Sequence, residues 1–181
     1  MKMPEKNQEK ANCTHAEQIN SVRQNLLNES YWVIDILPEQ VPAGGSGQYF
    51  TVEKYYLQPF RLADIHRRFT EVLIKLNCYY DFELCMYDGE QYLTNPAPEA
   101  LAFRISEMQE DLCIVLPEAE AVITLYHDDT YMTVYHPSEA MRRRLKLLAA
   151  AEGLFLRKPE QESSENAPAF QPENNRRSNF L

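Results

Sequence analysis

The polar residues best placed for chemistry are His127, Asp128 and Asp129, which stand together between two runs of apolar and aromatic residues. A histidine beside two carboxylates suits general acid–base catalysis or metal binding. Aspartates are, however, also common at the tips of β-hairpins, where they satisfy backbone groups. The sequence leaves both interpretations open and favours a hairpin turn at Asp128-Asp129.

Asp35 and His66 are the other candidates for catalysis. Asp35 interrupts an apolar run from Trp32 to Leu37, where a carboxylate must reach solvent or a hydrogen-bond donor. His66 lies beside the apolar stripe of a predicted helix, where a hydrogen-bonded structural histidine is the alternative. An enzyme would combine Asp35 with His66 or with the His127–Asp129 tip, and these residues would have to converge in one pocket.

Established catalytic signatures are absent from the sequence: it has no G-x-G-x-x-G, G-x-x-x-x-G-K-[ST], G-x-S-x-G or H-E-x-x-H motif. The glycine-rich stretch 44–47 leads into a predicted strand, whereas a phosphate-binding loop needs a following helix. His136 is expected opposite Ala121, far along the hairpin from His127, which excludes a zinc site shared within that hairpin. We therefore predict no metal and no cofactor.

The four cysteines contain no C-x-x-C pair. Cys85 and Cys113 lie in strand-like apolar runs, where a reduced buried thiol is the usual state. The sequence therefore predicts structural thiols here, with no disulfide framework.

These residues must be positioned by an α+β fold, with a mainly antiparallel sheet and helices packed on one face. Apolar spacing predicts helices over 17–27 and 61–77, and β-rich composition predicts strands over 31–37 and 48–57. We predict a disordered N-terminus over 1–14, a single domain over 15–159 and a disordered tail over 160–181. The domain has three parts, which span 15–77, 79–118 and 120–159.

The parts 79–118 and 120–159 each read as two strands, a helix and a strand. Their endings, E-D-L-C-I-V-L-P-E and E-G-L-F-L-R-K-P-E, align without a gap. We interpret them as two consecutive ββαβ units. Because hairpin–helix–strand is a common arrangement, a chance match is the alternative.

Two turns, at Asp88-Gly89 and Asp128-Asp129, set the register of the predicted hairpins, and register decides which side chains share a face. The aliphatic residues then form a core face. The opposite face carries tyrosine, threonine and carboxylates. Tyrosine and threonine favour strands without any function, but tyrosine is also frequent in binding hot spots. The predicted binding residues are Asp81, Glu83, Tyr87, Tyr92, Tyr126, Tyr131, Thr133 and Tyr135.

The formal net charge of −9 disfavours nucleic acid and anionic membranes as partners. The basic cluster 142–146 is predicted to spread around a helix as a solvated face. No secretory signal or membrane-spanning stretch is apparent, so a cytoplasmic location is expected. An acidic protein with a tyrosine-bearing sheet face suits a basic protein partner.

The leading functional hypothesis is a protein-interaction domain of a bacterial type: an immunity protein, an antitoxin or a regulator that binds a basic partner. The alternatives are an enzyme of unfamiliar class and a structural subunit of a larger assembly. The sequence leaves the oligomeric state open. Its basic and apolar end, 176–181, is either a docking peptide or a solvated terminus.

Overall fold

The computed structural model describes residues 5–42, 47–86, 91–107 and 111–159, with side chains described from residue 15 onward. Within these ranges, no helix combines the length and apolar character needed to cross a bilayer. The elements in chain order are α1 (Glu5–Leu26), β1 (Tyr31–Asp35), α2 (Tyr49–Tyr56), α3 (Pro59–Asn77), β2 (Glu83–Met86), β3 (Gln91–Thr94), α4 (Pro98–Ser106), β4 (Leu112–Leu116), η2 (Pro117–Ala119), β5 (Ala121–Leu125), β6 (Tyr131–Tyr135), α5 (Glu139–Ala151) and β7 (Phe155–Arg157).

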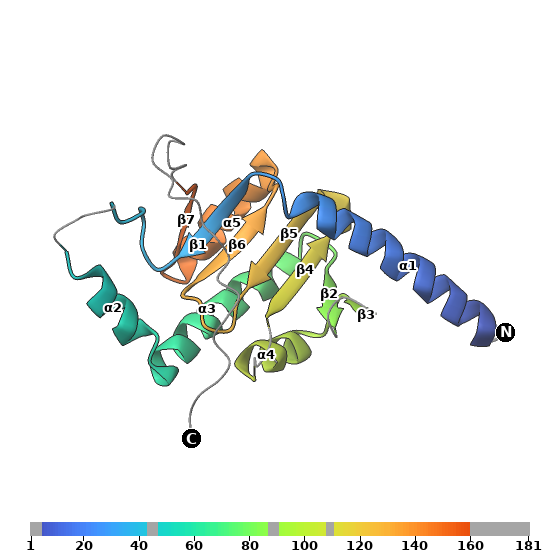
Figure 1. The fold of residues 1–181 in the computed structure, drawn as a ribbon, viewed down its shortest axis with the longest axis horizontal. Helices are drawn as coiled ribbons and strands as arrows, with labels where there is room; N and C mark the ends of the chain where they lie inside the picture. Colours follow the sequence, from blue (N-terminus) through green and yellow to red (C-terminus); the bar gives the residue numbers. More distant parts are fainter. Residues whose placement is uncertain (1–4, 43–46, 87–90, 108–110, 160–181) are drawn as a thin grey trace, which may run out of the picture.

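The strands form one seven-stranded sheet in the order β3-β2-β4-β5-β6-β1-β7 (Figure 1). Every pairing between neighbouring strands is antiparallel. The predicted α+β fold with a mainly antiparallel sheet is therefore confirmed.

Helices α3, α4 and α5 build the main core on one face of the sheet, with α3 packed between the other two. Pro59 stands in the first turn of α3, where its missing N–H costs nothing. Ser138 caps α5 by accepting a hydrogen bond from the backbone N–H of Met141. The stripe predicted on α3 is buried at Ile65, Phe69, Val72, Leu73 and Leu76.

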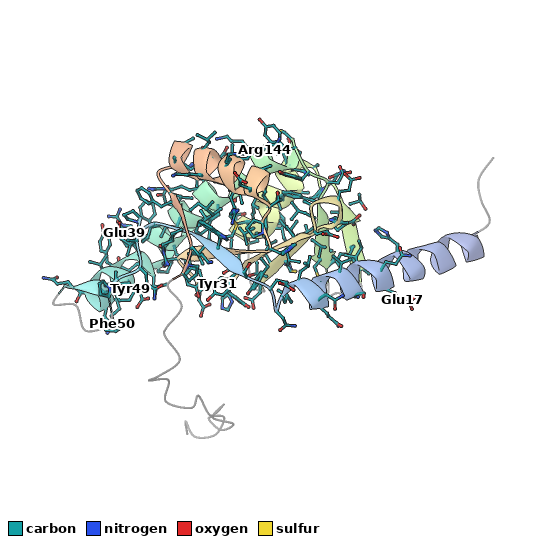
Figure 2. All side chains as sticks on the ribbon, turned by 90° about the horizontal axis from the view of Figure 1, so that it is seen from above. Glu17, Tyr31, Glu39, Tyr49, Phe50 and Arg144 are labelled. Atoms are coloured by element: carbon teal, nitrogen blue, oxygen red, sulfur yellow. The ribbon has the colours of Figure 1, made fainter. Side chains whose placement is uncertain are left out.

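Helix α1 packs on the opposite face of the sheet, which corrects the expectation that the helices share one face. Ile19 forms a small second core with Val115 of β4 and Val122 of β5. Figure 2 shows α5, with Arg144, on one side of the sheet, and α1 on the other side together with Tyr31, Tyr49 and Phe50. The sheet is therefore covered by helices on one face and only in part on the other.

Both hairpins adopt the predicted register. Leu84 pairs with Leu93 in the first hairpin, and Ile123 pairs with Val134 in the second. A slip by one residue would have moved every aliphatic side chain to the wrong face. The turn residues Asp88 and Gly89 lie outside the described residues.

Two N-terminal segments differ from expectation. The segment predicted as a strand over 48–57 is helix α2, where the hydroxyl of Tyr49 donates to Glu53 one turn later at 2.9 Å. The strand preference of aromatic residues depends on a neighbouring strand to pack against, and this segment pairs with none in the described sheet. Helix α1 already begins at Glu5, within the part of the chain expected to be disordered.

The order strand, strand, helix, strand occurs twice, but the two units occupy the sheet differently. In the first unit the last strand, β4, pairs with β2. In the second unit the last strand, β7, pairs with β1, which lies between β6 and β7. The similarity of the units is therefore one of chain order, and the N-terminal strand is inserted into the second.

Candidate functional site

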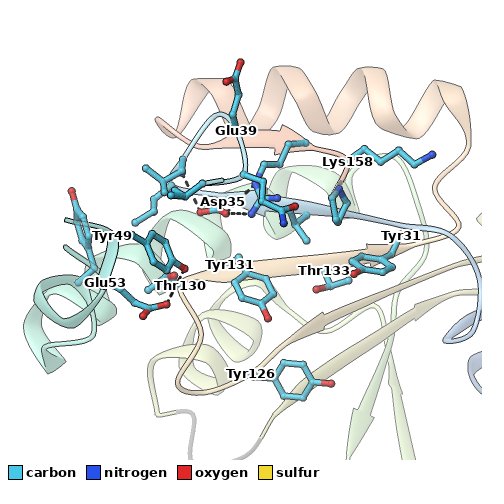
Figure 3. Close-up of a pocket in the computed structure, with 18 of the residues that line it drawn as sticks. Tyr31, Asp35, Glu39, Tyr49, Glu53, Tyr126, Thr130, Tyr131, Thr133 and Lys158 are labelled. Carbon is cyan, nitrogen blue, oxygen red and sulfur yellow. Dashed lines mark hydrogen bonds and ion pairs between the residues drawn. The ribbon is translucent and has the colours of Figure 1, made fainter. Parts of the chain in front are cut away.

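We call the sheet face opposite to α3, α4 and α5 the outer face. A broad groove of about 1240 Å³ lies between helix α2 and the outer face of strands β1 and β6. The segments 36–42 and 157–159 complete its walls. Figure 3 shows Tyr31, Tyr126 and Tyr131 across its floor, with Tyr49 and Glu53 of α2 at one side. The open part of the outer sheet face thus becomes a concave surface.

The floor of the groove follows from strand alternation, because alternate residues of a strand face the same side. Tyr31 pairs with Tyr135, and their rings lie 5.7 Å apart. Tyr126 and Tyr131 lie at the two ends of the loop that joins β5 to β6. The exposed fractions of Tyr31, Tyr126 and Tyr131 are 44%, 43% and 38%. These phenol rings are therefore open to a ligand.

Helix α2 supplies the opposite wall and has no buried residue of its own. Phe50 is 74% exposed, and Val52 is also exposed. Both line the groove together with Tyr49, whose ring packs edge-on against Phe50. Sequence reasoning missed these residues because it placed the segment in a strand. Their aromatic and apolar character was visible, but their helical arrangement was not.

Asp35 lies at the end of β1 and lines this groove. Its carboxylate accepts hydrogen bonds from Nε and Nη2 of Arg157 at 3.1 and 2.5 Å, and from the backbone N–H of Leu37 at 3.1 Å. Only 9% of its side chain is exposed. The ion pair with Arg157 therefore ties β7 to β1, and the geometry of Asp35 suits a structural role.

Three phenols of the groove, those of Tyr49, Tyr131 and Tyr135, stay protonated at neutral pH. Burial raises the pKa of Tyr131 to about 12, and the neighbouring Asp129 carboxylate adds to this rise. Burial likewise raises the pKa of Tyr49 and of Tyr135. The charge of the groove therefore comes from other groups. Among its described lining residues, four are carboxylates and two are cations: Glu29, Asp35, Glu39, Glu53, Arg157 and Lys158.

The predicted polar tip of the second hairpin is held against α3. Nε2 of His66 lies 3.3 Å from the backbone carbonyl oxygen of Asp129 and donates to it. Burial lowers the pKa of His66. At the surface, Nδ1 of His127 lies 3.2 Å from the carboxylate of Asp111. Burial, followed by the charge of Asp128, raises the pKa of Asp129.

The structure brings His66 to the tip, but the groove does not gather the catalytic candidates. Of Asp35, His66, His127, Asp128 and Asp129, only Asp35 is among the described residues that line the groove. Within the described ranges, no group of three or more His, Cys, Asp and Glu side chains is arranged to hold a metal ion. The hydrogen bond of His66 to Asp129 instead suits a structural contact between α3 and the tip of the second hairpin.

Helix α1 covers the part of the predicted binding face that lies on the first hairpin, β2 and β3. Glu83 is 5% exposed; its carboxylate accepts hydrogen bonds from the hydroxyl of Thr94 and lies 3.1 Å from Nε2 of His15. The hydroxyl of Tyr92 donates to Asn20 of α1 at 2.8 Å. These contacts correct the expectation that Glu83 and Tyr92 face an open surface.

Two other predicted binding residues belong to this region. Asp81 is exposed and accepts a hydrogen bond from Asn95 at 2.8 Å, at a position that does not line the groove. Tyr87 lies outside the described residues. The groove instead gathers Tyr126, Tyr131, Thr133 and Tyr135, which all come from the second hairpin.

Comparison with known proteins gives the chain no family: no family model matches it, and neither the curated proteins nor the solved structures yielded a match.

Proposed function

We propose that this protein is a binding protein whose tyrosine-lined groove receives a basic, extended segment of a protein partner. The observation that supports this most directly is the exposure of aromatic side chains around one concave surface, from Tyr31 and Tyr131 on the sheet to Phe50 on α2. Contiguous exposed apolar surface rimmed by polar groups is typical of interaction sites.

The chemistry of the groove favours a basic occupant. Asp35 and Arg157 neutralise each other, so the remaining described charges are those of Glu29, Glu39, Glu53 and Lys158. Neutral phenols can donate to and accept from a peptide backbone while their rings cover aliphatic stems and stack against cations. The carboxylates at the rim would speed association with a basic segment and make binding sensitive to salt.

An immunity protein, an antitoxin or a regulator in the cytoplasm would use such a groove in the same way, by occupying a basic segment of its partner. The proposal does not use the region under α1, since Glu83 and Tyr92 are already engaged there. It therefore concentrates the binding surface on the second hairpin and α2.

The test is selection of short random peptides, displayed on phage, against the immobilised full chain. We expect the selected peptides to be enriched in Lys and Arg with interspersed apolar residues. Their binding, measured by fluorescence anisotropy, should weaken at least about tenfold when Tyr126 and Tyr131 are both changed to Ala, because exposed aromatic residues commonly dominate binding energy.

Matched controls separate the groove from the rest of the surface. Tyr79→Ala removes an exposed tyrosine outside the groove and should leave affinity unchanged. Glu39→Gln should weaken binding at low salt and matter less at high salt, whereas Glu139→Gln on α5 should have no effect. Selected peptides without excess positive charge, or equal binding to the double tyrosine variant, would refute the proposal.

A further inference from the structure

Cys85 and Cys113 face each other across the adjacent strands β2 and β4. Glu83 pairs with Val115 and Leu84 with Ile114, so the next step of the same antiparallel register places Cys85 opposite Cys113. Their side chains interact, and each changes the pKa of the other. Directly opposed residues in antiparallel strands have Cα atoms about 4.5–5.5 Å apart, within the range that a disulfide spans.

Arg23 of α1 lies over this pair. Its Nη1 donates to the sulfur of Cys85 at 3.2 Å. The same helix is fixed to the sheet by Ile19 on one side and by the contact of Asn20 with Tyr92 on the other. The guanidinium is therefore held in position beside the thiol by packing as well as by charge.

The environment makes the two thiols unequal. The neighbouring thiol of Cys113, supported by the positive charge of Arg23, lowers the pKa of Cys85 to about 6. The sulfur of Cys85, together with burial, raises the pKa of Cys113. Of the two thiols, Cys85 therefore loses its proton more readily. Cys85 is also partly exposed, so a small reagent can reach it.

We propose that Cys85 and Cys113 form a peroxide-reactive dithiol, in which Cys85 is the attacking residue, Cys113 the resolving residue and Arg23 the group that holds the attacking sulfur. This inference is independent of the groove and of its occupant. It differs from the sequence-based expectation of two inert structural thiols, because that expectation did not include their pairing across the sheet.

The reaction consumes one hydroperoxide and transfers two electrons from the thiol pair to it. The Cys85 thiolate attacks one peroxide oxygen; an S–O bond forms, the O–O bond breaks, and the leaving oxygen takes up a proton to give water or an alcohol. The sulfur of Cys113 then attacks that of Cys85. The S–S bond forms, the S–O bond breaks, and the hydroxyl leaves as water with the Cys113 proton.

The experiment treats the reduced full chain with hydrogen peroxide and maps its cysteines by mass spectrometry after alkylation. We expect one product in which the peptides carrying Cys85 and Cys113 are linked and each thiol has lost its hydrogen. Cys78, which is exposed at the end of α3, serves as an internal reference. At neutral pH iodoacetamide should label Cys85 at least about tenfold faster than Cys78.

Variants assign the roles. Cys113→Ser should leave a sulfenic acid on Cys85 that dimedone traps, and Cys85→Ser should leave Cys113 reduced. Arg23→Met should slow labelling of Cys85 several-fold, while Arg23→Lys should retain most of the rate. Circular dichroism checks that each variant is folded. Preferential oxidation of Cys78, absence of the linked peptides, or Cys85 labelling that ignores Arg23→Met would overturn the proposal.

Discussion

The outer face of the sheet has two halves with similar residue types, but one half is covered by a helix and the other is exposed. In the covered half, Glu83 and Tyr92 are engaged by α1. In the open half, Tyr31 and Tyr131 remain exposed and line a groove. Strand composition therefore does not decide whether a tyrosine-bearing face binds a partner. What decides it is whether another element of the chain already packs there.

The covering helix differs from the helix beside the groove in how it meets the sheet. Ile19, Val22 and Leu26 of α1 recur at helical spacing and pack against β4 and β5. Helix α2 buries no residue, and Phe50 stays largely exposed. The mostly polar α1 thus covers the sheet and the aromatic-rich α2 does not, because covering depends on an apolar stripe that matches an apolar strip of the strands.

The largest effect on stability is expected at the ion pair of Asp35 and Arg157, which joins β1 and β7 in the open half. Arg157→Met would leave the carboxylate of Asp35 buried without its partner, and breaking such a pair costs about 3–5 kcal/mol. Urea unfolding of the variant measures this loss. Arg143→Met breaks an exposed pair with Glu139 and should cost no more than about 0.5 kcal/mol. Equal losses in the two variants would mean that the Asp35 site is as solvated as the surface.

A slightly smaller effect tests the packing of the covered half. Ile19→Ala removes the buried contact with Val115 and Val122 and should lower the free energy of unfolding by about 2–4 kcal/mol. Phe50→Ala, in the open half, should change it by no more than about 0.5 kcal/mol. Hydrogen exchange should show α1 opening more readily in the first variant. If Phe50→Ala were the more destabilising change, the contrast between the halves would be wrong.

The smallest effect concerns the hairpin tip at the end of the open half. Burial lowers the pKa of His66, so the unfolded chain takes up the proton at higher pH than the folded protein does. His66 therefore loses stabilising effect as the pH falls below its ordinary value of 6.5. Asp129, whose pKa is raised, acts in the opposite direction at lower pH.

His66→Gln separates these contributions, because glutamine can donate to the same carbonyl but does not titrate. Unfolding free energies measured at several pH values should fall less steeply below pH 6.5 in the variant than in the parent chain. Identical pH profiles would show that His66 does not hold the tip as a buried neutral imidazole.

The sequence by itself determined some local features of this fold, namely one helix and the alignment of two hairpins. The stripe on α3 and the registers that place Leu84 against Leu93 and Ile123 against Val134 all follow from apolar spacing and turn residues. These patterns are readable because each depends on neighbours a few positions away. They also identified four residues of the groove floor, from Tyr126 to Tyr135, without showing that a groove exists.

Only the tertiary structure decided which surfaces remain free and which side chains meet. The aromatic segment of α2 has the composition of a strand, but in the fold it has no strand partner and is helical. Glu83 is expected on an open face from the hairpin register, but it is buried because α1 packs over it. Arg23 and Cys85 are distant in sequence, and so are Asp35 and Arg157. Such contacts arise from the packing of whole elements, because burial depends on the other elements that pack there as well as on local spacing.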